Sequence, residues 1–363
     1  MAFGQEPDKI RSLQQRELSP IGFAIVGTGM IAGFHARALS RVQGGRLIGV
    51  VSRSRESGES FAAAHGVPFL GTSIDELASR PDVHVICIAT PSGAHLEPAL
   101  AAIRAGKHVV IEKPIEITTE RVDEIIEAAD RAGVLIAPIF QSRFGEGART
   151  VKAALEAGRA GRLVLCSAYV KWHRPSSYYT GWKGILAVDG GGAVMTQAIH
   201  GIDLLQWFSG MPEEIFAWTT RRVHTGIESE DTACAALKYS SGALGTIEAT
   251  TAAWPGWSRR IDICGELGSV VLEDDHITRW DFSRNEPGDE SIRAGKRDDS
   301  LGSGASVPSG IAVEGHIRQI QDLIDALRYD RPLGLDGREG RKAVAFVNAL
   351  YNSASLGVPV RPN

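Results

Sequence analysis

Cysteine is scarce in this chain of 363 residues, which contains four. Cys87, Cys166, Cys234 and Cys264 lie far apart and form neither a CxxC pair nor a Cys/His cluster. Such spacing is typical of free thiols in a reducing compartment rather than of a disulfide framework or a zinc site. We therefore expect free cysteines and no bound metal.

Long apolar runs and an excess of positive charge are also absent. The chain has no stretch of about 18 apolar residues, the length that a membrane-spanning helix needs, and its polar first 20 residues do not resemble a signal peptide. The 39 Lys and Arg residues against 43 Asp and Glu residues give a net charge of −4, whereas nucleic-acid binding normally requires a basic field. We expect a cytoplasmic protein with neither a membrane nor a nucleic acid as partner.

After an N-terminal arm at residues 1–20, short apolar runs alternate with helical stretches. The predicted strands are 21–26, 46–51, 83–89, 108–111 and 134–140, and the predicted helices are 31–40, 57–65, 95–105 and 119–132. Strands separated by helices of about ten residues indicate βαβ units and a parallel sheet that is buried on both faces. We expect a dinucleotide-binding Rossmann domain at residues 21–141.

The pattern changes after residue 141, where a predicted helix at 147–157 is followed by strand-like runs joined through short turns. The strands are predicted at 163–169, 214–223, 231–239, 243–251, 259–264 and 269–273, with helices at 197–208, 313–329 and 337–355 and a surface loop at 285–310. Short turns favour antiparallel pairing. The predicted fold class is α/β, with a C-terminal α+β domain at residues 142–363 whose open sheet is mostly antiparallel.

A glycine fingerprint, Gly27-x-Gly29-x-x-Ala32, follows the first predicted strand and opens the first predicted helix. Gly27 allows a tight turn, Gly29 lets a pyrophosphate approach the backbone, and Ala32 allows close packing of the helix on the strand. The helix N-terminus then offers amide donors and a partial positive charge. The expected cofactor contacts here are Gly27, Thr28, Gly29, Met30 and Ile31, and a purely structural turn is the alternative.

The residues after the second predicted strand bear on which cofactor binds. An NAD site usually carries an acidic residue about twenty residues past the glycine turn, whereas this chain has Ser52 and Arg53. A serine can donate to a 2′-phosphate, and an arginine can neutralise it. We expect NADP as the preferred cofactor, with NAD or a merely solvated basic loop as the alternatives.

Two further strand ends should face the cofactor, because parallel sheets bind ligands at their carboxyl edge. The residues at these ends are Ala89, Thr90, Pro91 and His95 after the third predicted strand, and Glu112 and Lys113 after the fourth. For His95, capping of the following helix is the alternative.

Four segments of the chain resemble the glucose–fructose oxidoreductase / inositol dehydrogenase / MocA (Gfo/Idh/MocA) family. They are GTGMIAGFHARAL, IATPSGAHLEPAL, AGKHVVIEKP and DGGGAVMTQAIHGIDLLQWFSG, and the resemblance extends to about residue 360. The combination of Glu-Lys-Pro with a triple glycine and a downstream His-x-x-Asp is specific. The resemblance implies that Lys113 and His200 flank the carbon that exchanges hydride with the cofactor.

The residue types agree with that implication. Oxidation of an alcohol needs a base for the hydroxyl proton, and histidine, with an unperturbed pKa of about 6.5, suits this role near neutrality. Lys113 can hydrogen-bond the same oxygen and stabilise developing negative charge. Outside the family context, Lys113 would be interpreted as a surface lysine and His200 as a satisfied helix residue.

Thr196 and Asp203 share a helix face with His200, because they lie four residues before it and three after it. We expect both near the substrate, with Asp203 either orienting the imidazole or making a structural helix contact. Many family members carry Asp or Asn at the position of Thr196, and a threonine cannot act as a carboxylate base. More of the proton transfer therefore falls to His200 and Lys113.

Aromatic and basic side chains are concentrated at residues 171–184. The predicted substrate contacts are Trp172, Arg174, Tyr179 and Trp182, with Lys183 as a second anion donor and Arg143, at the domain junction, as a further candidate. Flat aromatic faces and anion donors suit a sugar ring that bears a carboxylate or phosphate. The segment also resembles that of family members that oxidise nucleotide-linked uronic acids, and a packed interface strand is the alternative.

We therefore predict an oxidoreductase that transfers hydride between NAD(P) and a carbinol carbon of a sugar, sugar acid or nucleotide sugar, and that works as a homodimer or homotetramer. The alternatives are a keto-sugar reductase that uses the same residues and a non-catalytic, cofactor-sensing regulator on the same fold. Retention of Lys113 and His200 argues against the regulator.

Overall fold

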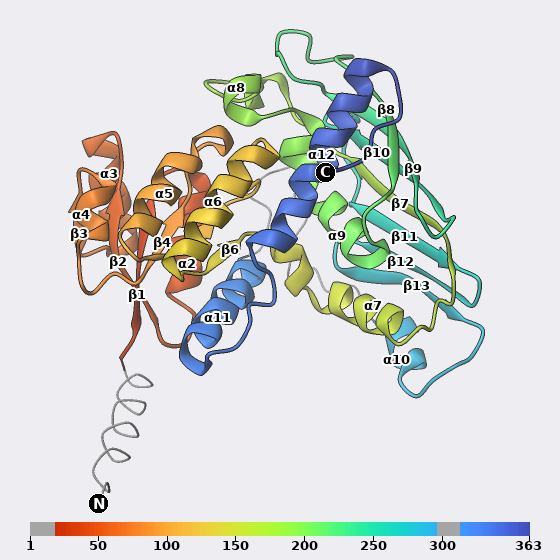
Figure 1. Cartoon of the computed structure of the whole chain (residues 1–363), viewed down its shortest axis with the longest axis horizontal. Helices are drawn as coiled ribbons and strands as arrows, with labels where there is room; N and C mark the ends of the chain where they lie inside the picture. The colour runs from red at the N-terminus through yellow and green to blue at the C-terminus, as the bar shows by residue number, and fades with distance from the viewer. Residues whose placement is uncertain (1–18, 296–312) are drawn as a thin grey trace, which may run out of the picture.

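The computed structural model describes residues 19–295 and 313–363. Nearly all of the predicted arm at residues 1–20, and part of the predicted loop at 285–310, lie outside the described residues. The described chain forms two sheets with helices packed on them, one from each half of the sequence (Figure 1).

The N-terminal sheet is parallel, with six strands in the order β3-β2-β1-β4-β5-β6. The strands are β1 (Ile21–Val26), β2 (Gly45–Val51), β3 (Phe69–Gly71), β4 (Val85–Ile88), β5 (His108–Ile111) and β6 (Ile136–Pro138), and the helices between them are α2 (Met30–Leu39), α3 (Arg55–His65), α4 (Ile74–Ala78), α5 (Leu96–Arg104) and α6 (Thr119–Ala132). The strand order reverses between β1 and β4, and such a reversal opens a crevice for a ligand at the carboxyl ends of the strands. The predicted Rossmann sheet is confirmed.

Local sequence signals begin and end several of these helices. Ser54 and Thr118 precede α3 and α6, and each side chain accepts a hydrogen bond from a backbone N–H in the first turn. Gly66 and Gly133 end the same helices in the left-handed conformation that glycine adopts without strain.

The C-terminal sheet has seven strands in the order β13-β12-β11-β7-β10-β9-β8. They are β7 (Leu163–Lys171), β8 (Glu214–Thr220), β9 (Thr232–Lys238), β10 (Leu244–Thr250), β11 (Arg260–Gly265), β12 (Gly268–Glu273) and β13 (His276–Phe282). All neighbours pair antiparallel except β7 and β10, which are parallel. Alternate residues of β9 and β10 are buried, so one face packs on helices and the other is open. The prediction of a mostly antiparallel open sheet is confirmed.

Helices α7 (Glu146–Glu156), α9 (Ile199–Ser209) and α12 (Gly337–Leu356) pack on the inner face of this sheet. Helix α11 (Glu314–Tyr329) instead returns to the N-terminal sheet, where Ile320 and Leu323 join the core of Phe23 and Ile25 (Figure 1). A domain boundary at residue 141 remains a prediction. Helix α11 belongs to the C-terminal half of the sequence but packs on the N-terminal sheet. No helix within residues 19–295 and 313–363 is long and apolar enough to cross a bilayer.

The structure also contains short elements that the sequence pattern does not predict. They are β3, α4, β13, α8 (Leu186–Asp189) and α10 (Asp289–Arg293). β3, α4, α8 and α10 have five residues or fewer, which is too short for a periodicity to stand out. β13 has seven residues, but its buried and exposed positions do not alternate, so its sequence lacks the usual strand pattern. The prediction of a loop is wrong at α10, because the Asp289 carboxylate accepts hydrogen bonds from Arg159 and Trp280 and holds the helix against β13.

Candidate active site

The glycine turn lies between β1 and α2. Gly27 has a φ of +109°, and a Cβ there would meet the Ala89 carbonyl oxygen at 2.6 Å. Gly29 faces open space, and α2 begins at Met30 without a side-chain cap. The first amide groups of α2 are therefore available to a ligand, and the open approach at Gly29 fits the pyrophosphate of a dinucleotide.

Three hydroxyl groups gather where β2 ends. The Thr28 hydroxyl oxygen lies 2.9 Å from that of Ser52 and 2.7 Å from that of Ser57. Arg53 follows on the exposed side of the same loop. The residues expected to discriminate between NAD and NADP thus lie beside the glycine turn, and the choice between the two cofactors remains a prediction.

His95 joins two of the predicted cofactor loops. Its Nδ1 lies 2.9 Å from the Pro114 carbonyl oxygen, and its Nε2 lies 2.9 Å from the Thr90 carbonyl oxygen. The side chain is buried and does not cap α5. Through these contacts His95 holds the loop after β4 against the loop after β5. Contact between His95 and the cofactor remains a prediction.

Glu112 is buried between two histidines. Its Oε1 lies 2.9 Å from Nε2 of His35 and 3.4 Å from Nε2 of His316. Burial opposes ionisation, but the two imidazoles outweigh it and hold the pKa of the carboxyl well below its usual range. Within the described residues these three side chains converge closely enough to hold a metal ion. The hydrogen bond between His35 and Glu112 already accounts for that proximity.

Lys113 reaches from the end of β5 to a π-helical segment, Ala193–Ala198, which leads into α9. Its Nζ donates a 2.6 Å hydrogen bond to the Thr196 carbonyl oxygen. Burial lowers the pKa of Lys113, against the attraction of Glu112 and Asp189. The strand-end lysine therefore meets the segment that carries His200.

His200 lies in the first turn of α9 and is buried. Burial lowers the pKa of its imidazole well below the usual value, and the charges of Lys113 and Arg259 act in the same direction. Its Nδ1 has no hydrogen-bond partner among the described residues. An imidazole kept neutral in this way can accept a proton, as a general base must.

Thr196, Asp203 and Arg143 are engaged with other parts of the protein. The Thr196 hydroxyl donates to the Gly192 carbonyl at 2.7 Å, and both oxygens of Asp203 accept from Arg143, at 2.7 and 2.8 Å. No hydrogen bond joins Asp203 to His200 in the described part of the chain. Asp203 and Arg143 are buried against each other, an arrangement that agrees with the structural interpretation of Asp203. Contact of either residue with the substrate remains a prediction.

Arg174 lies in the substrate segment but is 1% exposed. Its guanidinium donates to the His173 carbonyl at 2.9 Å and to Oε1 of Gln197 at 2.8 Å, and it lies 5.0 Å from the ring centre of Trp172. A direct contact between Arg174 and a substrate anion remains a prediction. The partner of Arg174, Gln197, is a residue that the sequence reasoning missed and that only its place beside Thr196 could have indicated.

A second cation of the segment, Lys183, lies over the ring of Tyr178. Lys183 is partly exposed, and its Nζ lies 3.9 Å from the ring centre of Tyr178, whose hydroxyl accepts from Nε2 of Gln197 at 2.9 Å. The Tyr179 hydroxyl bonds to Thr251 at 2.6 Å. Trp182 is 39% exposed, so it remains available to a ligand.

Asp189 is a second residue that the sequence reasoning missed. It directly precedes the triple glycine and is buried, and its Oδ2 accepts a 2.6 Å hydrogen bond from the Gly184 amide. Burial raises its pKa to about 6, although Lys113 and Lys183 favour the ionised form. A carboxyl group with such a shifted pKa beside two lysines is a candidate functional group.

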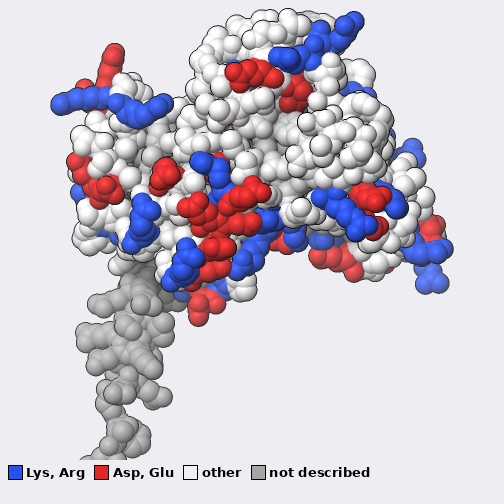
Figure 2. Space-filling view, turned by 45° about the horizontal axis from the view of Figure 1, so that its top comes forward, with Lys and Arg blue, Asp and Glu red and all other residues white. Residues whose placement is uncertain are grey.

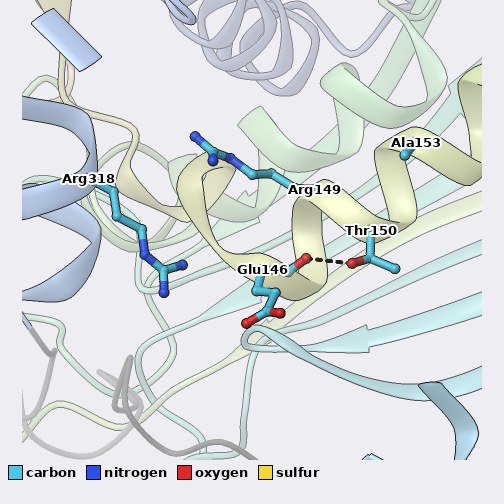
Figure 3. A pocket seen from close by; sticks show the side chains of 5 residues that line it. All are labelled: Glu146, Arg149, Thr150, Ala153 and Arg318. Carbon is cyan, nitrogen blue, oxygen red and sulfur yellow. Dashed lines mark hydrogen bonds between the residues drawn. The ribbon is translucent and has the colours of Figure 1, made fainter. Parts of the chain in front are cut away.

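A hollow of about 430 Å³ lies away from these residues, between α7 and α11 (Figure 3). Its lining residues are Glu146, Arg149, Thr150, Ala153 and Arg318. On the face drawn in Figure 2, acidic and basic side chains are interspersed. This mixed surface contrasts with the group of three cations formed by Lys113, Arg174 and Lys183.

Comparison with known proteins gives two family matches. The family described as an oxidoreductase family with an NAD-binding Rossmann fold matches residues 21–140, and the GFO/IDH/MocA C-terminal domain matches residues 148–271. The 1,5-anhydro-D-fructose reductase of Ensifer adhaerens is 30% identical over 224 residues, which cover 61% of this chain and 67% of that protein.

Two solved structures resemble the whole described architecture. The WlbA dehydrogenase from Bordetella pertussis, in complex with NADH and UDP-GlcNAcA, is 33% identical with a TM-score of 0.84, covering 94% of this chain and 98% of that one. The WlbA dehydrogenase from Chromobacterium violaceum, in complex with the same two molecules, is 32% identical with a TM-score of 0.85, covering 94% and 96%.

Proposed function

We propose a function from one premise: this chain belongs to the Gfo/Idh/MocA family of oxidoreductases, in which an NAD-binding Rossmann domain precedes a C-terminal domain. It is an enzyme that uses a nicotinamide cofactor. The proposed reaction is hydride transfer between that cofactor and a carbinol carbon of an acidic sugar. A nucleotide-linked uronic acid is the specific candidate.

The cationic group near Lys113 carries the proposal of an acidic substrate. Arg174 and Lys183 lie on the ring of Tyr178, 5.5 and 3.9 Å from its centre, and the charges of Arg174 and Asp189 both act on Lys113. With these four groups and Glu112 ionised, three cations stand against two carboxylates, so the group carries a net positive charge. Because the side chains are largely withdrawn from water, an anionic group on the substrate would be stabilised there.

Two relatives support the same substrate class. The WlbA dehydrogenases hold NADH together with UDP-GlcNAcA, and each aligns with 94% of this chain. Their identity of 32–33% supports a related substrate without specifying the sugar. The reductase from Ensifer adhaerens is a reason to assay both directions of the reaction.

Lys113 and His200 carry the proposed chemistry. The nicotinamide supplies the hydride acceptor when the cofactor is bound. His200, neutral because it is buried, takes the hydroxyl proton of the substrate as hydride leaves the same carbon, and the ammonium of Lys113 stabilises the negative charge that develops on the oxygen. In the reverse direction, His200 returns the proton to the carbonyl oxygen.

The proposed cofactor preference is for NADP. Ser52 and Arg53 stand where an acidic residue would exclude a 2′-phosphate, and Arg53 is exposed and able to reach one. Both WlbA dehydrogenases hold NADH, so the proposed preference rests on Ser52 and Arg53 of this chain alone.

A substrate panel tests the proposed reaction. Nucleotide-linked uronic acids, free sugar acids and their neutral counterparts are assayed with NAD and NADP, and the products are assayed in reverse. We expect the acidic member of each pair to have the higher kcat/KM. Equal kcat/KM for the neutral member would remove the acidic-substrate proposal, and no turnover on the panel would remove the proposed sugar substrate class.

The outer face of the C-terminal sheet leads to a proposal about assembly. Trp218, Leu244 and Leu165 lie on this face and are 62%, 55% and 44% exposed. A monomer rarely leaves such a sheet face uncovered. The proposed state is a homodimer or homotetramer in which a second copy covers it.

A further inference from the structure

The start of the π-helical segment Ala193–Ala198 is held by a residue from outside it. The Glu230 carboxylate accepts hydrogen bonds from the amides of Gly192, at 2.9 Å, and Val194, at 2.8 Å. The backbone carbonyl of Glu230 accepts from the Ala193 amide at 3.0 Å. A helix begins with amide groups that have no partner inside the helix, and Glu230 supplies partners for three of them.

Tyr351, from α12, completes this set. Its hydroxyl accepts from the Met195 amide at 3.2 Å and donates to Oε1 of Glu230 at 2.9 Å. Four consecutive amides, from residue 192 to residue 195, are therefore satisfied by two residues that are distant in sequence. Burial of a carboxylate is costly, and these hydrogen bonds offset that cost.

Two of the three glycines, Gly191 and Gly192, provide room for the Tyr351 side chain and the Glu230 backbone. A Cβ on Gly192 would lie 1.7 Å from the Glu230 carbonyl oxygen, and a Cβ on Gly191 would lie 2.1 Å from the Tyr351 hydroxyl. Any larger residue at either position would displace Glu230 or Tyr351. Close contact with these two residues thus explains the requirement for glycine at positions 191 and 192.

The held segment positions both proposed catalytic side chains. Its Thr196 carbonyl is the acceptor for Lys113 Nζ, at 2.6 Å, and the segment continues directly into α9, where His200 is the second residue. π-Helical turns are frequent at functional sites. A shift of residues 192–195 would therefore move the lysine contact and the imidazole together.

We propose that Glu230 and Tyr351 form a clamp that positions Lys113 and His200 for hydride transfer. The inference rests on the proposed function for its kinetic consequence. Neither residue touches the reacting atoms, so both are positioning residues. Small displacements of reacting groups have large kinetic effects, whereas binding of the cofactor at the glycine turn does not depend on this clamp.

Tyr351→Phe is the test variant, because it removes one hydroxyl and keeps the ring. The matched control is Tyr239→Phe, which also removes a buried tyrosine hydroxyl, one bonded to Ser209 at the other end of α9 at 3.0 Å. We expect Tyr351→Phe to lower kcat about 10- to 100-fold, with the KM of the substrate and the Kd of the cofactor nearly unchanged. Tyr239→Phe should keep the wild-type kcat. Equal kcat in the two variants would overturn the clamp.

Amide hydrogen exchange gives a readout that does not depend on activity. Residues 192–196 should exchange faster in Tyr351→Phe and in Glu230→Gln than in the wild type, and should be unchanged in Tyr239→Phe. Unchanged amide exchange in the Glu230→Gln variant would also overturn the clamp. This measurement decides the question even if Tyr351→Phe does not fold. If the wild type turns over no substrate, the proposed substrate fails while the exchange experiment still decides on the clamp.

Discussion

Burial determines what the two proposed catalytic side chains can do. It lowers the pKa of both Lys113 and His200 because each charged form loses its hydration. For His200 the result is a neutral imidazole that is ready to accept a proton. Lys113 remains beside the carbonyl of Thr196 and the carboxylates of Glu112 and Asp189, which favour its ammonium form.

The first prediction concerns these two residues. Lys113→Met and His200→Ala should each lower turnover by at least about 10²-fold, because one removes the charge that stabilises the substrate oxygen and the other removes the base. Steady-state kinetics and cofactor titration measure this, and cofactor affinity should stay within a few-fold. His276→Ala, on the edge strand β13, is the control and should keep full turnover. An active His200→Ala variant with an unchanged pH profile would assign the proton to another group.

The second prediction concerns pH. Because burial and neighbouring cations lower the pKa of His200, the imidazole should stay neutral, and the enzyme active, to below about pH 6.5. Activity should fall as the pH drops through the depressed pKa of His200, which the pH profile of kcat/KM measures. Burial raises the pKa of Asp189 to about 6, so Asp189 can also contribute to the pH profile. The pH profile of the Asp189→Asn variant identifies that contribution. A loss of activity centred above pH 6.5 that persists in Asp189→Asn would contradict the assignment.

The third prediction concerns Arg53. Arg53→Ala should weaken NADP binding at least about tenfold through loss of a charge-assisted contact to the 2′-phosphate, and should leave NAD binding unchanged. Calorimetric titration of the apo protein with each cofactor measures it. Arg55→Ala is the matched control, because Arg55 is exposed two residues away and pairs with Glu59. Wild-type protein that binds NAD tenfold more tightly than NADP would show that the cofactor preference is the reverse.

At the scale of elements, the candidate site is made by the ends of secondary structure rather than by their middles. Lys113 follows β5, the π-helical segment precedes α9, and Asp189 ends α8. Residues 171–184 continue from β7, and a 2.7 Å hydrogen bond between the Arg174 amide and the Thr251 carbonyl ties them to the end of β10. Rigid elements thus set the position of a site built from loops and turns.

The fourth prediction tests the charge of the substrate segment. Lys183→Met and Arg174→Gln should each lower kcat/KM for an acidic sugar by about tenfold or more, and should change it little for the neutral counterpart. The ratio of the two kcat/KM values is the measurement. Lys171→Met, which removes a lysine that pairs with Glu248 on the outer face of the sheet, is the control. An unchanged ratio in Lys183→Met would mean that the cationic group serves packing.

At the scale of the whole molecule, the two sheets are joined by helices that cross between them. Helix α11 packs against α2 of the Rossmann half, and α12 packs against both α6 and α9 (Figure 1). These helix contacts thereby fix the carboxyl ends of the N-terminal strands relative to residues 171–184. The outer face of the C-terminal sheet is uncovered in the described part of the chain, with Trp218 and Leu244 exposed.

The fifth prediction concerns assembly. Light scattering with size-exclusion chromatography should give a dimer or tetramer for the wild type, and Trp218→Glu with Leu244→Glu should shift it toward monomer, because charges would be buried in the apolar contact. Leu356→Glu, which changes an exposed leucine at the end of α12, is the control and should leave the mass unchanged. A monomeric wild type would remove the proposal.

The sequence by itself determined the Rossmann sheet, the glycine turn, the position of Lys113 at a strand end and the helical register of His200. These features depend on periodicity and on short motifs, so each is encoded within a few adjacent residues. The open antiparallel sheet was predictable for the same reason. The helices α8 and α10 were not, because each is too short to have a clear period of its own, and the edge strand β13 was not, because its residues do not alternate between buried and exposed.

Only the tertiary structure decided which partners the polar residues find. It paired Asp203 with Arg143, buried Arg174 against Gln197, engaged His95 with two backbone carbonyls, and brought Glu230 and Tyr351 to the start of the π-helical segment. These contacts join residues that are distant in the chain, and neither local sequence indicates the other. Burial, which decides whether a charged side chain meets a ligand or another residue, is a property of the packed molecule and not of any single segment.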